Sequence, residues 1–268
     1  MSDDRPIGVF DSGLGGLTVV RHLLRLLPSE SIVYLGDTAR VPYGSRSPET
    51  VRKFARQDAY FLAGHGVKFI VIACNTASAL AEEDLAGRLA IPVLGVIKPG
   101  AAAAVRLSRG GNIGVIGTRG TISSGSYQRL VRQLLPSARI TGQPCPLFVP
   151  LAEEGAACSP AAALIAEEYL ALLQAAQVDT LILGCTHYPL LEPVIRQTMG
   201  SKVMLVDPGR ALADQLRCRL EELGLEATGR RPPFHRYFVT DCTAQFQPLA
   251  ESFLGAPLLG SVEQVDLE

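Results

Sequence analysis

Short apolar runs alternate with longer segments of helical periodicity along almost the whole chain. The runs are continuous, which is typical of strands buried on both faces of a parallel sheet. In the first part of the chain they span residues 7–10, 31–35, 68–73 and 92–96. Between them, apolar residues recur every three or four positions, as at Leu17, Val20 and Leu24. Strands that alternate with helices of this length predict an α/β fold with a parallel sheet.

Helix starts can also be placed from the sequence. Ser47 followed by Pro48 predicts an N-cap and a first-turn proline. A second helix is expected over 76–89, and a third is expected to be entered at Pro99 and Gly100.

The pattern then begins again. Four segments of the first part have a counterpart about 106 to 112 residues later, in the same order, and a self-match at a nearly fixed period is an organising signal. The pairs are 7–13 with 113–119, 43–48 with 154–160, 67–76 with 178–187, and 92–100 with 202–210. We therefore expect two related halves, roughly 6–97 and 112–206.

The last segment, 207–268, has no partner in this repeat. Its pattern predicts a helix over 208–223, a loop that contains RRPPF, a strand RYFVT, a helix and a final strand. It is too short to hold a large core alone, so it must pack on one of the halves.

Composition narrows the class of protein. The chain has 268 residues, 47% of them apolar, and a formal net charge of −1 with both signs interspersed. A nucleic-acid binder needs a basic stripe that is missing here. The acidic N-terminus runs directly into a strand pattern and predicts no signal peptide, and no stretch is long and apolar enough to span a bilayer. We expect a cytoplasmic protein in which the six cysteines are thiols rather than disulfides.

Two of these cysteines stand at matching places in the repeat. Cys74 ends the run IVIAC and Cys185 ends the run LILGC. Ligands in open parallel sheets bind outside the carboxyl ends of the strands, and free N–H groups at the helix starts that follow suit a carboxylate. The loop DSGLGG, which begins at Asp11, lies at the same predicted edge. The other four cysteines, Cys145, Cys158, Cys218 and Cys242, are interpreted as small buried hydrophobes.

Three kinds of chemistry fit a cysteine pair. A metal site has suitable ligands in Cys74, Cys185, His187 and Asp11, but it lacks a close pair such as C-x-x-C. A redox pair usually has the same short spacing. Proton transfer needs only thiols tuned by their surroundings, and racemisation at a carbon needs similar groups on its two opposite faces. Two related halves that face one another supply such groups, so proton transfer is favoured.

The chain resembles the glutamate racemases of the cofactor-independent amino-acid racemase group. The segments that carry the resemblance are GVFDSGLGGLTV, GDTARVPYG, ACNTASA and GCTHYPLL, and it extends over essentially the whole chain. The resemblance implies that the chain converts L-glutamate to D-glutamate for bacterial peptidoglycan, with no cofactor and no metal. It also implies two doubly wound parallel-sheet domains in a pseudo-twofold arrangement, 1–97 plus 207–268 and 98–206, with the active site in the cleft between them.

The resemblance further implies roles for single residues. Cys74 would deprotonate D-glutamate with help from Asp11, and Cys185 would deprotonate L-glutamate with help from His187. Glu153 matches a further acidic helper. The substrate-holding set implied by the motifs comprises Asp11, Ser12, Tyr43, Gly44, Asn75, Thr76, Thr118, Thr121, Thr186 and His187.

Two other functions stay open. One is racemisation of another acidic amino acid such as aspartate, against which GCTHYPLL argues. The other is a non-catalytic protein that binds an amino acid, although binding alone does not require two thiols. The expected partners are glutamate and a second copy of the chain in a homodimer, with no nucleic acid and no membrane.

Overall fold

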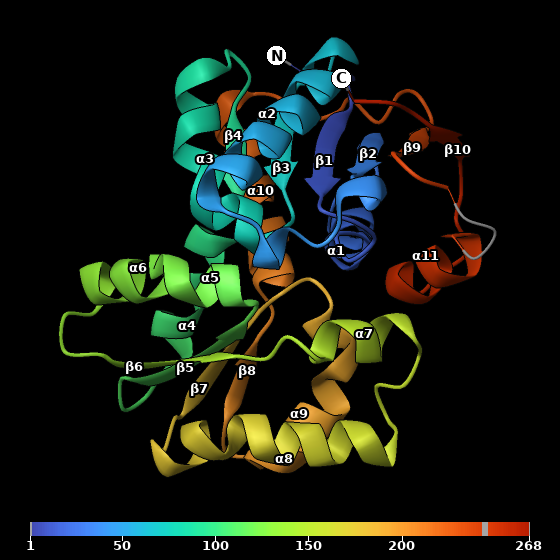
Figure 1. The fold of residues 1–268 in the computed structure, drawn as a ribbon. Helices are drawn as coiled ribbons and strands as arrows, with labels where there is room; N and C mark the ends of the chain where they lie inside the picture. The colour runs from blue at the N-terminus through green and yellow to red at the C-terminus, as the bar shows by residue number, and fades with distance from the viewer. Residues whose placement is uncertain (1, 243–245, 268) are drawn as a thin grey trace.

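The computed structural model describes residues 2–242 and 246–267. In these residues the strands form two separate sheets, and every strand pair in both sheets is parallel (Figure 1). The strands are β1 (Ile7–Asp11), β2 (Ile32–Gly36), β3 (Phe69–Ile72), β4 (Val93–Gly95), β5 (Asn112–Gly117), β6 (Arg139–Pro144), β7 (Thr180–Gly184), β8 (Met204–Val206), β9 (His235–Val239) and β10 (Ser261–Gln264).

The order of the strands carries the repeat that the sequence predicts. The first sheet runs β10-β9-β2-β1-β3-β4 and the second runs β6-β5-β7-β8. The stretch β2-β1-β3-β4 therefore corresponds strand for strand to β6-β5-β7-β8, so two related α/β units are confirmed. The last segment of the chain extends the first sheet, because β9 pairs with β2. The domain boundaries at 97/98 and 206/207 stay a prediction.

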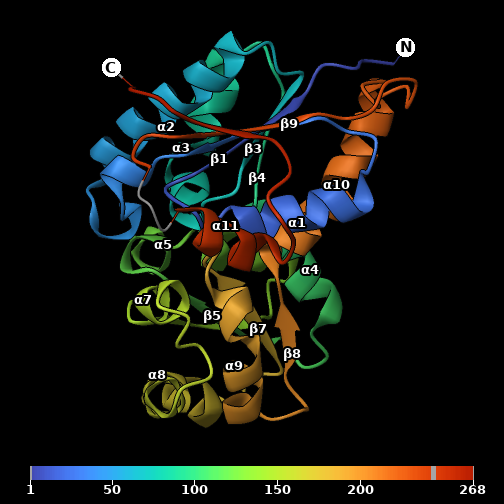
Figure 2. The ribbon, with the colours of Figure 1, turned by 90° about the vertical axis from the view of Figure 1, so that its right-hand side faces the viewer.

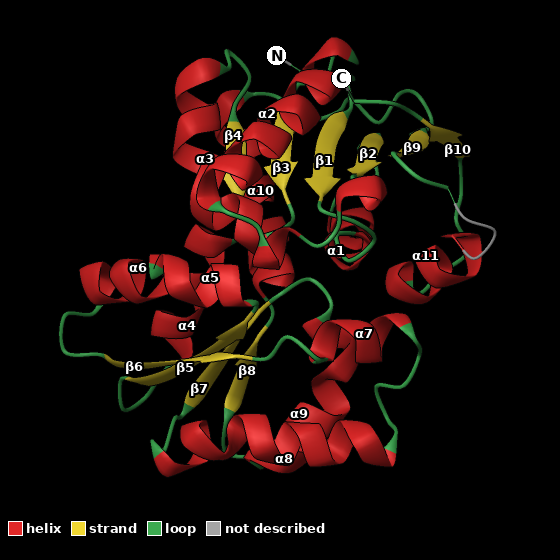
Figure 3. Cartoon of the chain, viewed as in Figure 1, coloured by secondary structure: helices red, strands yellow, loops and turns green. Residues whose placement is uncertain are grey.

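Helices cover both faces of each sheet (Figures 1 and 3). In the first unit α2 and α3 pack on one face, and α1, α10 and α11 lie on the other, where the side view shows α1 beside α10 (Figure 2). In the second unit α4 and α6 lie opposite α8 and α9. The helices are α1 (Leu17–Leu26), α2 (Pro48–Gly64), α3 (Asn75–Arg88), α4 (Ile97–Leu107), α5 (Arg119–Ser124), α6 (Ser126–Leu134), α7 (Phe148–Glu153), α8 (Pro160–Ala175), α9 (Glu192–Met199), α10 (Pro208–Leu223) and α11 (Phe246–Leu254). Short 3-10 turns are η1 (Thr38–Arg40), η2 (Tyr43–Ser45) and η3 (Tyr188–Leu191).

Local sequence explains where equivalent helices begin. Oγ of Ser47 accepts a hydrogen bond from the N–H of Thr50 at 3.3 Å, and proline occupies the first turn of α2. In the second unit, Oγ of Ser159 accepts a hydrogen bond from the N–H of Ala162 at 3.2 Å and caps α8 in the same way. Helix α4 begins at Ile97, two residues before the predicted entry, because a proline in the first turn sacrifices no intrahelical N–H.

One hydrophobic cluster is continuous across the two units. It contains Val9 of β1 and Tyr34 of β2 in the first sheet, Leu183 of β7 in the second, and Phe253 of α11. These side chains are at most 1% exposed. Both sheets therefore rest on one shared core at the side where the units meet.

Candidate active site

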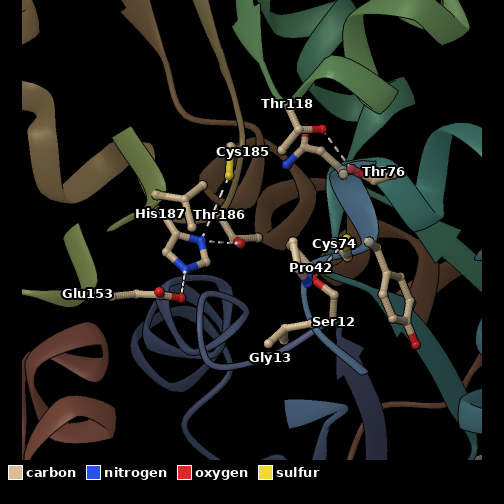
Figure 4. Close-up of a pocket in the computed structure, with 15 residues that line it drawn as sticks. Ser12, Gly13, Pro42, Cys74, Thr76, Thr118, Glu153, Cys185, Thr186 and His187 are labelled. Atoms are coloured by element: carbon tan, nitrogen blue, oxygen red, sulfur yellow. Dashed lines mark hydrogen bonds and ion pairs between the residues drawn. The ribbon is translucent and has the colours of Figure 1, made fainter. Parts of the chain in front are cut away.

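Strands β1, β3, β5 and β7 point their carboxyl ends toward the junction of the two units (Figure 1). A cavity lies at this junction (Figure 4). Cys74 follows β3 and Cys185 follows β7, and both line this cavity. The full lining consists of Ser12, Gly13, Val41, Pro42, Tyr43, Gly44, Cys74, Asn75, Thr76, Thr118, Val149, Glu153, Cys185, Thr186 and His187. Every residue predicted from the sequence is in this set except Asp11 and Thr121.

Cys74 lies at the start of helix α3 and is its N-cap. Its Sγ accepts a hydrogen bond from the N–H of Ala77 at 3.5 Å, and its thiol donates to Oγ of Ser12 at 3.6 Å. The first-turn N–H groups of α3 have no partner within the helix. Burial, and next the charge of Asp11, raise the pKa of Cys74 to about 12. This sulfur is therefore a protonated thiol near neutral pH.

Cys185 has a different neighbour, an imidazole. Its Sγ lies 3.8 Å from Nδ1 of His187, whose Nε2 lies 3.0 Å from Oε1 of Glu153 (Figure 4). Burial alone lowers the pKa of His187, but the hydrogen bonds with Cys185 and Glu153 outweigh it and raise the pKa to about 10. The ring is therefore cationic near neutral pH, and its Nδ1–H stabilises negative charge on the sulfur of Cys185.

Asp11 lies behind the cavity wall. Its side chain is fully buried, and its Oδ2 accepts from the N–H of Gly13 at 3.1 Å. Its Oδ1 accepts from the hydroxyl of Thr186, in the other unit, at 3.5 Å. Burial raises the pKa of Asp11. The carboxylate thus joins the loops of both units and acts on Cys74 through its charge rather than by lining the cavity.

Polar groups of both units meet at the cavity. The hydroxyl of Thr76 lies 2.9 Å from that of Thr118 and 3.1 Å from that of Thr121. Thr121 thus supports two lining residues from behind. Tyr127 donates to Oδ1 of Asn75 at 2.7 Å, which leaves the amide nitrogen of Asn75 free to donate into the cavity.

Tyr43 lines the cavity, but its hydroxyl is directed away from it. Its hydroxyl contacts the carboxylates of Asp37 and Asp58, the latter at 2.9 Å, and the residue is 1% exposed. The hydroxyl is therefore not available to a ligand, and Tyr43 offers the cavity its ring and main chain.

Two glycines allow the units to approach each other here. A Cβ on Gly15 would lie 2.2 Å from Oγ1 of Thr186 and 2.6 Å from the ring of His187. A Cβ on Gly44 would lie 2.6 Å from Cβ of Thr118. The GLGG segment therefore serves close contact between the units, which its sequence alone does not specify.

The lining also includes residues that sequence reasoning missed, namely Gly13, Val41, Pro42 and Val149. Three of them are apolar residues of loops or a short helix, and no spacing rule marks such residues as part of a site. The only signal for Val41 and Pro42 was their place beside Tyr43 and Gly44 in GDTARVPYG.

The remaining cysteines correct one expectation. Cys145 is buried, as predicted, but Cys158, Cys218 and Cys242 are exposed. They lie in a loop before α8, on the outer face of α10 and in the loop after β9, and Cys218 and Cys242 have polar neighbours in the sequence. All six cysteines are free thiols. Within residues 2–242 and 246–267, no three His, Cys, Asp or Glu side chains are arranged to hold a metal ion, and no helix is long and apolar enough to cross a membrane.

Known proteins share this chain's sequence and fold. Residues 7–216 match the family described as Asp/Glu/Hydantoin racemase. The glutamate racemase of Geobacter metallireducens is 48% identical over 264 residues, which cover 98% of this chain and 97% of that protein. The crystal structure of a glutamate racemase isoform from Bacillus anthracis superposes with a TM-score of 0.94 at 41% identity and 98% coverage of both chains.

A second crystal structure, that of glutamate racemase from Francisella tularensis in complex with D-glutamate, superposes with a TM-score of 0.93. It has 41% identity and 99% coverage of both chains. These likenesses extend over nearly the full length of the chain and include both units and the cavity between them. The chain therefore belongs to the Asp/Glu/Hydantoin racemase family and, within it, to the glutamate racemases.

Proposed function

We propose that this glutamate racemase interconverts L- and D-glutamate in the cavity between its units by a two-base mechanism that uses Cys74 and Cys185. The observation that carries the proposal is the placement of these two thiols after equivalent strands, β3 and β7, on the walls of one cavity. Each unit thus contributes one sulfur, which suits removal of a proton from one face of the α-carbon and delivery of a proton to the other.

The two sulfurs begin in different states. In the direction from L- to D-glutamate, the mechanism requires a thiolate on Cys185, whose sulfur lies 3.8 Å from Nδ1 of His187, and a proton on Cys74. With L-glutamate bound, the Cys185 thiolate takes the α-proton, and the electron pair of the broken C–H bond stays on the substrate. The Cys74 thiol then gives its proton to the opposite face and becomes a thiolate. The product is D-glutamate, and the two sulfurs have exchanged their states.

The lining supplies donors for a dicarboxylate. Candidates are the amide of Asn75, the hydroxyls of Thr76, Thr118 and Thr186, and the first-turn N–H groups of α3. Donors aimed at the α-carboxylate would stabilise the negative charge that develops as the α-proton leaves. A thiolate is a weak base toward such a proton, so this stabilisation is a necessary part of the mechanism. Asp11 and Thr121 act from behind the wall.

Optical activity tests the reaction. Circular dichroism of L-glutamate incubated with purified protein and a chelator, with no cofactor added, should fall to zero, while L-aspartate should keep its signal. Loss of activity after exhaustive chelation, with recovery on adding zinc, would contradict a thiol-only mechanism. Racemisation of aspartate at a comparable rate would favour the alternative substrate, and binding of glutamate without any loss of signal would favour a non-catalytic protein.

Solvent isotope exchange tests the two-base feature. In deuterated water, newly formed D-glutamate should carry deuterium at the α-carbon, while the remaining L-glutamate should carry little at early times. Equal early incorporation into both enantiomers would show that a single base reaches both faces.

The biological setting follows from the family resemblance. We propose that the D-glutamate supplies peptidoglycan synthesis and that the protein works in the cytoplasm as a homodimer. Depletion of the gene product should make cell growth depend on added D-glutamate. Light scattering coupled to gel filtration would test the dimer, and a mass equal to one chain would exclude it.

A further inference from the structure

A buried polar cluster lies behind the cavity wall formed by Val41, Pro42, Tyr43 and Gly44. Its members come from five places in the chain: Asp37 after β2, Arg40 in η1, Tyr43 in η2, Asp58 in α2 and Thr240 after β9. Both carboxylates are fully buried and the Arg40 side chain is 19% exposed. None of these polar groups takes part in the mechanism above, so their burial behind the cavity wall has to have another reason.

Arg40 binds both carboxylates. Its Nε lies 2.8 and 2.6 Å from the two oxygens of Asp37, and its Nη2 donates to Oδ1 of Asp58 at 2.9 Å. Thr240 donates to Oδ1 of Asp37 at 3.0 Å. One guanidinium thus faces two carboxyl groups. If both carboxyl groups were ionised, the buried cluster would keep one uncompensated negative charge, which is costly in a low-dielectric interior.

The contacts of the Tyr43 hydroxyl also indicate that one of the two carboxyl groups carries a proton. Its oxygen lies within hydrogen-bonding distance of Oδ2 of Asp37 and of Oδ2 of Asp58. A hydroxyl has a single proton, so it can donate to only one of them. If both carboxyl groups were ionised, lone pairs of the Tyr43 oxygen would face lone pairs of the carboxylate that receives no proton, and the two would repel each other. A proton on one carboxyl group turns both contacts into hydrogen bonds and neutralises the cluster.

We propose that Asp58 is a neutral carboxylic acid in the folded protein and that it positions the Val41–Gly44 wall of the cavity through Tyr43. Its Oδ2–H donates to the Tyr43 oxygen, and the Tyr43 hydroxyl donates to Asp37. Asp58 touches no substrate, so it is a positioning residue for the proposed racemisation.

The proton belongs on Asp58 because Asp37 has the better acceptor environment. Each carboxyl group accepts one arginine N–H, but Asp37 shares the Nε–H of Arg40 between its two oxygens and also accepts from the hydroxyl of Thr240, whereas Asp58 accepts only from Nη2 of Arg40 apart from its contact with Tyr43. Burial, followed by the neighbouring charge of Asp37, raises the pKa of Asp58 well above its ordinary value, and Asp11 at the end of β1 adds to the same direction. Arg40 opposes this shift without cancelling it.

The Val41–Gly44 wall is held by these hydrogen bonds, and it also contacts the second unit. Gly44 packs against Thr118 of the second unit, and Gly120 packs against the carbonyl oxygen of Gly44. A displaced Tyr43 would shift this contact, and a misplacement of about 1 Å at a reacting site can cost about 10²-fold in rate.

A stability comparison tests the protonation state without any activity assay. Asp58→Asn keeps the shape of the neutral acid, with an N–H directed at Tyr43 and a carbonyl oxygen directed at Arg40. In the wild type, Asp58 is protonated when folded and ionised when unfolded, so unfolding releases a proton. The unfolding equilibrium constant of the wild type, divided by that of Asp58→Asn, should therefore rise with pH above about pH 5, with a slope approaching tenfold per pH unit, until the pH reaches the raised pKa of Asp58 in the folded protein. The exposed Asp214→Asn serves as the matched control, with a flat ratio.

Activity tests the positioning role, and this arm rests on the proposed function. Asp58→Asn should retain most of the wild-type kcat/KM, because the amide preserves both hydrogen bonds. Asp58→Leu and Asp37→Asn should each lose about 10²-fold, the first by releasing Tyr43 and the second by placing an amide where only acceptors fit.

A flat stability ratio for Asp58→Asn, failure of that variant to fold, or better retention of activity in Asp37→Asn than in Asp58→Asn would each overturn the proposal. If the wild type fails to racemise glutamate, the proposed function is wrong, while the stability comparison still decides the state of Asp58.

Discussion

Nε2 of His187 lies 3.0 Å from Oε1 of Glu153, and this contact links the cavity to a partly exposed carboxylate at the end of α7. Because Glu153 helps to raise the pKa of His187, its charge supports the cationic ring that faces Cys185. The side chain of Glu153 is 42% exposed, so solvent screens this support.

Replacing Glu153 by Gln should lower kcat/KM about fivefold, since a solvent-screened ion pair is worth about 1 kcal/mol at most. The neighbouring variant Glu154→Gln makes the same change at an exposed glutamate outside the cavity lining, and it should leave kcat/KM near the wild-type value. Steady-state rates from circular dichroism measure both. Equal effects of the two variants would show that general surface charge, rather than the contact with His187, is responsible.

Activity should fall at high pH as His187 loses its proton. The pKa of the ring is raised to about 10, so kcat/KM should decline as the pH rises through about 10. L- and D-glutamate have equal free energy in water, so kcat/KM must be the same in both directions at every pH. Parallel pH profiles of the two directions check this. In Glu153→Gln the decline should begin at lower pH, because a raising influence on the pKa of His187 is gone.

Serine at either catalytic position should nearly abolish racemisation. A hydroxyl is far less readily ionised than a thiol, so Cys74→Ser and Cys185→Ser should each lose about 10²–10⁴-fold in kcat. The exposed Cys158 gives a matched control, since Cys158→Ser changes the same atoms outside the cavity. Near-normal turnover by either of the first two variants would refute the two-thiol mechanism.

A methyl group on Gly15 should disable the site. The added Cβ would lie 2.2 Å from the hydroxyl oxygen of Thr186, so the loop that follows Cys185 must move. We expect Gly15→Ala to lose about 10²-fold in kcat/KM. Gly87, inside α3, has open space around it, and Gly87→Ala should keep activity and raise the free energy of unfolding by about 0.5–1 kcal/mol. Chemical denaturation and rate measurements on both variants separate loss of fold from loss of function.

The sequence predicts the sheets well, because buried parallel strands such as those ending at Asp11 and Ile72 form continuous apolar runs. It also places Cys74 and Cys185 at the carboxyl ends of equivalent strands in the two related units, since the repeat aligns IVIAC with LILGC. Helix entry at Ile97 was missed by two residues, because proline in a first turn is compatible with several starting points.

Local pattern cannot reveal which way a side chain turns. Tyr43 is predicted from the resemblance to hold substrate, and its hydroxyl points to Asp37 and Asp58, which are respectively 6 and 15 residues away. That Asp11 assists Cys74 stays a prediction, and the side-chain hydrogen bond that Asp11 accepts comes from Thr186, 175 residues later. Tyr43, Asp37 and Asp58 belong to the first unit, so their contacts depend on how its loops pack on α2, whereas the contact of Asp11 with Thr186 depends on how the two units are joined. No periodicity encodes either geometry.

The hydrophobic cluster that spans both sheets ties the geometry of the site to folding. Val9, Leu183 and Phe253 belong to one continuous core, so the two sheets share the apolar contacts that keep the chain folded. Cys74 and Cys185 follow strands of different sheets, so the distance between their sulfurs rests on the same contacts. A core substitution far from the cavity can therefore change stability and the geometry of the site together.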